Sequence, residues 1–522
     1  MFNKILNNPN YVLYVIPFTI GLLTVFSFQP FNFTLINFFV LPTLFLLIVY
    51  VNKKTKNTYR EKPYYKNFFL IGFVFSFAFY LSGTFWISYS LTFDENFKFL
   101  IPFSILFIPL FLSLFTGLTT LIIGKYLEYN FTSILLFSAS LSFSDFVRGK
   151  ILSGFPWNLW AYSWSWTNEI LQLLNLLGLF AFNIIVITIF TIPAVLFLNL
   201  SFIKKFLVIV ITAVLVFTNY IYGTFAVNKN KAFINNINKS KRVNIKVVSP
   251  NFTIKYDQTN QEIENKLKNL IRYSDPNPER NTIFIWPEGV FTGYSYGEVL
   301  KFSKLIKKNF SKNHKIIFGV NTIEKKTNKY FNSLILVNND FEILQKYNKK
   351  KLVPFGEFLP MENLLNKFGF KKITEGHGSF SAGNNDNIIK IENIISIPLI
   401  CYEIIFPELI QKSTEDSNLI INISEDGWFG NSIGPHQHFS KAIFRSIENN
   451  TFLVRSANQG ISAIIDNKGE ILKKLETHET GSIEMNIPLI KSDYKNKNDL
   501  IFLILLITYL AIFLIFKKNA KK

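Results

Sequence analysis

The sequence predicts an α-helical membrane bundle joined to an α/β domain, and two observations carry this prediction. Hydrophobic residues make up 49% of the chain, and they gather in long runs before residue 228 and in one more run near the C-terminus. Residues 228–495 are instead rich in Lys, Asn and Glu, and short β-branched segments alternate there with amphipathic ones. A chain this apolar and yet this charged fits neither a soluble domain nor a pure membrane bundle, so we expect both kinds of domain.

Each predicted membrane span is an apolar run near the length of about 20 residues that crosses a bilayer. About eight runs qualify, and the shortest of them is rich in Ser. No small-residue cleavage site follows the first run, so we interpret it as an anchor and not as a removed signal peptide. The spans are expected near residues 11–28, 34–51, 67–89, 99–124, 131–146, 168–200, 204–224 and 499–516. The expected domains are a transmembrane bundle at 1–227, an α/β domain at 228–495, and a C-terminal transmembrane helix with a basic tail at 496–522.

Basic residues at the span ends predict the orientation of the chain, because cytoplasmic loops carry an excess of Lys and Arg. The loop at 53–66 and the tail after residue 516 are both strongly basic, so both are expected in the cytoplasm. Counting spans from this loop places residues 225–498 on the outer side of the membrane, provided that 131–146 also crosses it.

The net charge of +20, from 55 basic and 35 acidic residues, is attributed to a membrane partner and not to nucleic acid. The lysines lie largely at the ends of the apolar runs and on the polar domain, where anionic lipid headgroups attract them. The single cysteine excludes an intramolecular disulfide and a Cys-rich metal site. The five histidines show no HExxH spacing, and the pair His436 and His438 is too little to predict a metal site.

Strand and helix patterns alternate within residues 228–495, which is typical of a single α/β domain. Short β-branched runs predict the strands, and amphipathic segments predict the helices between them. The expected strands are 243–248, 282–286, 315–320, 333–337, 395–400 and 421–424, and the expected helices are 261–273 and 298–309.

Reactive side chains gather in three segments that we interpret as strand ends. Because the C-terminal ends of strands face the crevice where α/β folds bind ligands, a side chain there is well placed for chemistry. We expect the three segments to be neighbouring strand ends of one sheet. They are Trp286-Pro287-Glu288-Gly289, the stretch from Tyr347 to Glu357, and Cys401-Tyr402-Glu403, which holds the only cysteine.

Together, Glu288, Lys349 and Cys401 form a complete set of groups for acyl transfer. A buried carboxylate with a raised pKa can take the thiol proton and later return it, and a fixed ammonium can stabilise the oxyanion of a tetrahedral intermediate. Each residue also has a plainer interpretation. A lone cysteine is most often a small buried hydrophobe, Glu288 fits the first turn of a helix, and Lys349 lies in a lysine cluster of the kind that forms a solvated face.

Two further segments have competing interpretations. The Trp-rich connection at 145–166 is typical of the headgroup layer at a span end; alternatively, Arg148 and its aromatic neighbours help to hold a phospholipid headgroup. The segment 357–372 combines large apolar residues with lysines. This pattern predicts either an amphipathic arm that lies on the bilayer or an ordinary surface helix and loop.

The three strand-end segments together resemble the nitrilase superfamily, and with the surrounding spans the whole chain resembles the apolipoprotein N-acyltransferase family. The resemblance covers essentially the full length and implies an α-β-β-α sandwich for the α/β domain. The most specific motifs are Tyr347-x-Lys349-x-x-Leu352-Val353-Pro354-Phe355-Gly356-Glu357, Gly154-Phe155-Pro156-Trp157 and Asp426-Gly427-Trp428-Phe429-Gly430-Asn431-Ser432-Ile433-Gly434-Pro435.

By position, the resemblance implies that Glu288 is the general base, Lys349 the oxyanion stabiliser and Cys401 the nucleophile. One departure is Lys351, where the family usually has His, so the choice among three neighbouring lysines rests on the spacing from Tyr347. The supporting residues implied in the same way are Glu357 near Lys349, Glu403 and Tyr402 beside the cysteine, and Trp286, which would shape the acyl pocket.

The resemblance implies a ping-pong reaction without metal or cofactor. Cys401 would take an acyl chain, normally from phosphatidylethanolamine, as a thioester, and would pass it to the N-terminal amine of an S-diacylglyceryl-cysteine apolipoprotein. The expected setting is a monomer in the bacterial cytoplasmic (inner) membrane, with the catalytic domain on the periplasmic face. One alternative is a membrane-tethered carbon–nitrogen hydrolase, either an amidase or a nitrilase, that uses water as acceptor. The other is a transporter with an external binding domain, but its spans would need polar residues.

Overall fold

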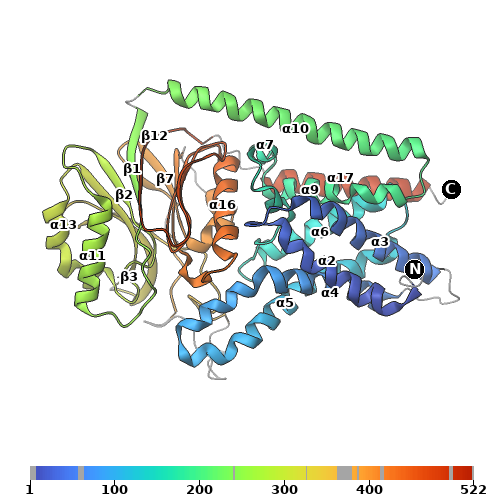
Figure 1. The fold of residues 1–522 in the computed structure, drawn as a ribbon, viewed down its shortest axis with the longest axis horizontal. Helices are drawn as coiled ribbons and strands as arrows, with labels where there is room; N and C mark the ends of the chain where they lie inside the picture. Colours follow the sequence, from blue (N-terminus) through green and yellow to red (C-terminus); the bar gives the residue numbers. More distant parts are fainter. Residues whose placement is uncertain are drawn as a thin grey trace. The chain divides into compact units, whose positions relative to one another are not determined.

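The computed structural model describes residues 7–56, 64–238, 241–324, 326–360, 379–384, 387–411, 417–492 and 498–519. Its internal contacts divide the chain into two compact units (Figure 1). The first unit comprises Met1–Ser88, Phe99–Ala226 and Lys497–Lys522, and the second comprises Tyr89–Lys98 and Val227–Asn496. The short segment Tyr89–Lys98 belongs to the second unit, and its Phe93 packs edge-on against Trp428 of the same unit, with ring centroids 5.0 Å apart.

The first unit is helical throughout its main elements, and the membrane bundle predicted from the sequence is confirmed. Six helical segments within the described residues are long and apolar enough to cross a membrane: Thr34–Thr55, Tyr65–Phe93, Glu95–Tyr126, Leu179–Phe197, Phe202–Asn236 and Asp499–Lys518. A shorter apolar helix covers Tyr11–Ser27. The main helices are α2 (Ile16–Thr24), α3 (Asn37–Lys56), α4 (Tyr65–Thr84), α5 (Ile101–Ile123), α6 (Phe131–Lys150), α7 (Asn168–Leu171), α8 (Leu174–Leu177), α9 (Leu179–Thr191), α10 (Phe202–Asn236) and α17 (Asn498–Asn519).

Two predicted spans differ in the structure. The expected span at 168–200 is broken, because Gly178 has a φ of 77° and separates the short helices α7 and α8 from α9. The apolar segment therefore starts at Leu179. The expected span at 131–146 forms the 20-residue helix α6. It is rich in Ser and carries Asp145 and Arg148, and it is not among the six apolar segments.

Two six-stranded sheets form the second unit in the part that the structure describes. The first has the order β12-β1-β2-β3-β4-β5 and the second the order β11-β10-β9-β8-β7-β6. In each sheet three strands run parallel, β1-β2-β3 and β7-β8-β9, and the flanking pairs are antiparallel. The strands are β1 (Arg242–Ser249), β2 (Thr282–Ile285), β3 (His314–Glu324), β4 (Lys329–Val337), β5 (Ile343–Asn348), β6 (Ile389–Ile391), β7 (Ile394–Ile400), β8 (Leu419–Glu425), β9 (Leu453–Asn458), β10 (Ser462–Ile465), β11 (Ile471–Leu475) and β12 (Gly481–Pro488).

The two sheets pack face to face, with helices on their outer faces, so the predicted α-β-β-α sandwich is confirmed (Figure 1). Alternate side chains of β1, such as Ile245 and Val247, join those of β8 and β9 in the core between the sheets, because successive side chains of a strand point to opposite faces. The other face of the first sheet packs on α11 (Asn260–Ser274) and α13 (Ser303–Asn309). Helix α16 (Gly434–Asn449) covers the second sheet.

Candidate active site

The three predicted reactive residues lie at the ends of strands from both sheets. Glu288 follows β2, Lys349 follows β5 directly, and Cys401 follows β7 directly. The expectation that these strands are neighbours in one sheet is wrong. Strands β2 and β5 are separated by β3 and β4 in the first sheet, whereas β7 belongs to the second. The residues meet because the sheets pack face to face, and Cys401 lies in the core between them.

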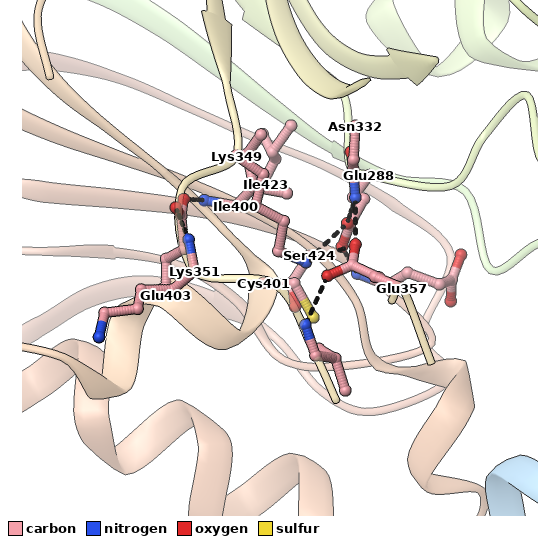
Figure 2. Close-up of polar contacts among 12 residues, drawn as sticks. Glu288, Asn332, Lys349, Lys351, Glu357, Ile400, Cys401, Glu403, Ile423 and Ser424 are labelled. Carbon is pink, nitrogen blue, oxygen red and sulfur yellow. Dashed lines mark hydrogen bonds and ion pairs between the residues drawn. The ribbon is translucent and has the colours of Figure 1, made fainter. Parts of the chain in front are cut away.

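Lys349 is the centre of a buried charged cluster (Figure 2). Its ammonium donates to Glu357 Oε1 at 3.0 Å and lies 3.5 Å from Glu288 Oε1. The amide of Asn332, on β4, donates to the same two oxygens at 2.7 Å each. Burial by itself would lower the pKa of Lys349, but the charges of Glu288 and Glu357 outweigh it and raise that pKa above its usual range. The ammonium therefore stays charged, as an oxyanion stabiliser must.

Glu288 is held at both carboxylate oxygens. Its Oε1 accepts from Asn332, and its Oε2 accepts from the backbone N–H of Glu425 at 3.1 Å. The backbone near it tolerates only glycine at two positions. A Cβ on Gly289, whose φ is +74°, would lie 2.5 Å from Glu425 Oε2, and a Cβ on Gly319 of β3 would lie 2.8 Å from the Glu288 Cα. These close approaches fix the backbone that carries the carboxylate, and the two hydrogen bonds hold its oxygens.

Glu403 ties the segment after β5 to the end of β7. Its Oε1 accepts from the Tyr347 hydroxyl at 2.8 Å and from the backbone N–H groups of Lys350 at 2.7 Å and Lys351 at 3.1 Å. Its Oε2 accepts from the backbone N–H of Ile400 at 2.8 Å. Because one buried carboxylate bonds both segments, it sets the position of Lys349 relative to Cys401 (Figure 2).

Cys401 is buried, and its thiol is protonated in the resting site. Burial raises the pKa of the thiol, and so does the Glu288 charge, while Lys349 and a hydrogen bond with Ser424 lower it less. The thiol pKa ends well above its ordinary value. The thiolate is the nucleophilic form of a cysteine, so attack needs a base that removes the proton as the new bond forms. Glu288 is the carboxylate whose charge acts most strongly on this thiol.

We expect the alkylation of Cys401 by iodoacetamide to be slow at neutral pH and to accelerate steadily with pH. A raised pKa means a smaller thiolate fraction at any given pH, so the rate should climb up to about tenfold per pH unit and still be climbing above pH 9. The unfolded protein is the control, because its thiol should level off near the ordinary value of about 8.5. A rate that is already constant by pH 7 would show that the folded thiol is a preformed thiolate.

The structure separates Trp286 from these residues. Its indole is fully buried in the outer core between the first sheet and α11, and its N–H donates to Ser274 Oγ at 2.9 Å. The resemblance implied that Trp286 shapes the acyl pocket. Its indole instead lies on the opposite face of the first sheet from Cys401. Tyr402 follows the cysteine and packs edge-on against Phe406, with ring centroids 5.0 Å apart.

The structure also distinguishes Lys349 from Lys351. The Lys351 ammonium is partly exposed, lies 3.6 Å from Glu408 and sits over the Phe406 ring. It therefore faces away from Glu288 and Glu357. The predicted lipid-facing arm at 357–372 lies outside the described residues beyond Pro360.

Arg148 is engaged inside the helical unit and not by a ligand. It is 2% exposed, donates to Asp145 Oδ1 at 2.9 Å and to the backbone oxygen of Phe155, and lies over the Tyr80 ring. Asp145 also accepts from Asn183 at 3.0 Å. This bonding corrects the hypothesis that Arg148 holds a phospholipid headgroup, because its guanidinium is buried against protein groups.

Sequence reasoning missed Asn332 and a buried polar cluster beside Cys401. Asn332 is a polar residue inside a strand whose neighbouring positions are mostly apolar and buried. Such an interruption is a usable signal, because buried polar groups are almost always bonded to something. The second signal is the alternation Asn422-x-Ser424-x-Asp426 along β8 and its end, which puts three polar side chains on one face.

The chain is similar to known proteins over most of its length. Residues 258–492 match the carbon–nitrogen hydrolase family, and residues 20–192 match the apolipoprotein N-acyltransferase N-terminal domain. An apolipoprotein N-acyltransferase of Rickettsia typhi is 30% identical over 482 residues, which cover 91% of this chain and 92% of that protein. The chain belongs to the apolipoprotein N-acyltransferase family.

Further relatives extend over the same length. The apolipoprotein N-acyltransferase of Rhodopseudomonas palustris is 28% identical over 489 residues, 91% of this chain and 89% of that protein. Among solved structures, Saccharomyces cerevisiae Nit3, a member of branch 10 of the nitrilase superfamily, aligns with 48% of this chain and 90% of its own at 18% identity and a TM-score of 0.34. Family membership makes the chain an acyltransferase of the nitrilase superfamily, and its bacterial relatives together with the six apolar segments make it a bacterial membrane protein.

Proposed function

We propose that the protein transfers an acyl chain from a phospholipid, through a thioester on Cys401, to the N-terminal amine of an S-diacylglyceryl-cysteine apolipoprotein, and so completes lipoprotein maturation. The observation that carries this proposal is the buried Glu288–Lys349–Glu357 cluster beside the only cysteine, in a chain of the apolipoprotein N-acyltransferase family. The proposed triad is Glu288, Lys349 and Cys401, with Glu357 and Glu403 as supporting residues.

In the first half-reaction, Glu288 takes the thiol proton while the Cys401 sulfur attacks the ester carbonyl of the phospholipid. A carbon–sulfur bond forms, and the carbonyl electrons move to an oxyanion that the Lys349 ammonium stabilises. The oxyanion collapses and breaks the ester carbon–oxygen bond. Glu288 returns its proton to the leaving alkoxide, so a lysophospholipid departs and the thioester remains.

In the second half-reaction, the α-amine of the apolipoprotein attacks the thioester carbonyl. Glu288 accepts a proton from the attacking amine, and Lys349 again stabilises the oxyanion. Collapse breaks the carbon–sulfur bond and leaves an amide. The sulfur takes back the proton from Glu288, which restores the resting thiol. A thioester retains enough reactivity toward an amine to drive amide formation.

Two contacts support Glu288, and not Glu357, as the base. Glu357 lies closer to the Lys349 ammonium, at 3.0 Å against 3.5 Å for Glu288, and its second oxygen accepts from the backbone N–H of Val353 at 2.9 Å. Glu357 is thus the carboxylate more firmly paired with the Lys349 ammonium. The Glu288 charge acts on the Cys401 thiol directly, as a carboxylate that receives its proton must.

The proposal includes the setting of the reaction. The chain is a multi-pass protein of the cytoplasmic membrane with its catalytic domain on the periplasmic face, supported by the basic loop at 53–66 and the basic C-terminal tail. Phosphatidylethanolamine is the proposed donor, the acceptor is a diacylated apolipoprotein, and the protein acts as a monomer without metal or cofactor.

Mass spectrometry of the purified protein tests this function in two steps. After incubation with phosphatidylethanolamine vesicles, we expect one fatty acyl adduct on the peptide that contains Cys401, and release of lysophospholipid. Addition of a synthetic diacylated lipopeptide should remove the adduct and give the N-acylated peptide. If the protein instead releases free fatty acid with no peptide product, or ammonia from small amides, it is a carbon–nitrogen hydrolase and the proposal fails.

A further inference from the structure

A buried polar cluster, which we call the Asp426 cluster, lies against the backbone of Cys401 and is not used by the reaction steps above. Its members come from different elements and converge at the end of β7. All of them are fully buried: Asn422 and Ser424 on β8, Asp426 just after it, His438 on α16, and Arg455 on β9. Burying a polar group costs free energy unless the group is hydrogen-bonded. The hydrogen bonds of the cluster therefore show which parts of the chain it holds in place.

His438 is the member that contacts Cys401. Its Nε2 lies 3.2 Å from the backbone oxygen of Cys401, and its Nδ1 lies 2.9 Å from Asp426 Oδ1. A backbone oxygen only accepts hydrogen bonds, so Nε2 must carry the hydrogen and donate. Nδ1 is then the nitrogen without a hydrogen, and it accepts from the Arg455 guanidinium at 3.1 Å, so the imidazole links the peptide of the nucleophile to a fixed guanidinium.

Asp426 is itself held by two donors. Arg455 donates to its Oδ2 at 2.7 Å, and the Ser424 hydroxyl donates to its Oδ1 at 2.6 Å. Burial alone would raise the pKa of Asp426, but the charge of Arg455 brings that pKa below its usual range. Asp426 is therefore ionised and fixed, and it holds the guanidinium that donates to the imidazole.

The same cluster also bonds β7 two residues before Cys401, at Leu399. Arg455 donates to Asn422 Oδ1, and the Asn422 amide donates to the backbone oxygen of Leu399 at 3.0 Å. The cluster therefore bonds two backbone oxygens of the strand end, those of Leu399 and Cys401. Both oxygens belong to the stretch of chain that carries the sulfur into the site.

The backbone conformation of Cys401 explains why these hydrogen bonds are needed. Its φ is +48°, in the left-handed region that residues other than glycine rarely adopt. A residue stays in this conformation only where its surroundings over-determine it, and such residues concentrate at functional sites. The direction of the Cα–Cβ bond, and hence the place of the sulfur, depends on this peptide. The bond from His438 acts on that peptide directly.

We propose that His438, oriented by the Arg455 guanidinium that Asp426 holds, is a positioning residue that keeps Cys401 in the left-handed conformation from which its sulfur reaches the acyl donor. This inference rests on the proposed function, because it concerns the same thioester step. His438 touches no reacting atom in this role. Its loss should therefore slow thioester formation without weakening phospholipid binding.

The test compares His438→Ala and His438→Gln with the wild type, and uses His436→Ala, on the same helix but outside the cluster, as the matched control. The readouts are the single-turnover rate of thioester formation on Cys401, the KM for phosphatidylethanolamine and the unfolding temperature. For His438→Ala we expect a rate lower by about 10- to 100-fold, since small misplacements of reacting groups act on this scale, with KM within about twofold of the wild-type value. His438→Gln should recover most of the rate, because its amide nitrogen can donate to the same backbone oxygen.

Three outcomes overturn the inference. One is a His438→Ala enzyme that forms the thioester at the wild-type rate. Another is a folded His438→Gln enzyme that forms the thioester as slowly as the alanine variant, or that is slow while the alanine variant fails to fold. In either case the restored hydrogen-bond donor would not have restored the rate. The third is that neither variant folds, which would assign the cluster to the fold and not to the nucleophile. Wild-type protein that forms no thioester would instead refute the proposed function itself.

Discussion

A Cys401→Ala variant should carry no acyl group after incubation with phospholipid and should acylate no lipopeptide. Cys401 is the only cysteine, so no second thiol in the chain can replace it. Loss of a nucleophile that acts in concert with a base and an oxyanion stabiliser lowers the rate by roughly 10⁴-fold or more. The measurement is lipopeptide acylation with phosphatidylethanolamine vesicles, together with intact-protein mass spectrometry.

Cys401→Ser is the matched control for this experiment. Serine keeps the size and hydrogen bonding of the side chain, so the fold and the buried carboxylates should be undisturbed. A hydroxyl is a far weaker nucleophile than a thiol, and the resting site offers it no stronger base than Glu288. We therefore expect Cys401→Ser to unfold at the wild-type temperature and to show little or no transfer. Substantial acylation by Cys401→Ala would mean that the acyl chain never passes through the sulfur.

Lys349→Met should lose both activity and stability, because the ammonium forms ion pairs with both Glu288 and Glu357. Removing an oxyanion stabiliser typically lowers the rate by about 10²- to 10³-fold. Breaking a buried ion pair by removing one partner typically costs about 3–5 kcal/mol, because the remaining charges are left buried without compensation. Transfer assays and thermal unfolding of the same preparation measure the two effects.

Two further variants separate these effects. Lys351→Met makes the same substitution at a partly exposed lysine that faces Glu408, and it should leave both rate and stability near wild type. The double variant Lys349→Met with Glu357→Gln removes one of the two opposed carboxylates. It should regain much of the lost stability and none of the lost activity. A single Lys351→Met variant that is inactive, beside an active Lys349→Met, would transfer the oxyanion role to Lys351.

The membrane bundle and the α/β domain were predictable because both depend on patterns local to the sequence, whereas the two-sheet sandwich was expected only from the resemblance to the nitrilase superfamily. An apolar run of bilayer length is visible without any tertiary contact, as is a β-branched run that ends in a reactive residue. The segment at Tyr347 was interpreted as a strand end, but the range of its strand, β5, was not predicted, for the opposite reason. Its residues, Ile343–Asn348, are half polar without regular alternation and begin exposed, so the segment lacks the signal of a buried strand. It becomes a strand through pairing with β4.

The errors concern long-range geometry. The sequence places Trp286 beside Glu288, yet the alternation of a strand sends the indole to the outer core while the chain turns the carboxylate toward the site. Arg148 looked available to a lipid, but three groups within the helical unit engage it. In both cases the deciding contact joins residues that the sequence cannot show to be close.

The sequence by itself determined the two kinds of domain, the single thiol, and the acidic and basic residues fit to serve it, because hydropathy, periodicity and residue chemistry are properties of short segments. Only the tertiary structure decided that Glu288 and Lys349 reach Cys401 across two sheets, that Lys349 and not Lys351 is the buried cation, and that His438 bonds the cysteine's own peptide. Those outcomes depend on how two sheets pack and which side chains the packing buries, and burial is a property of the whole fold.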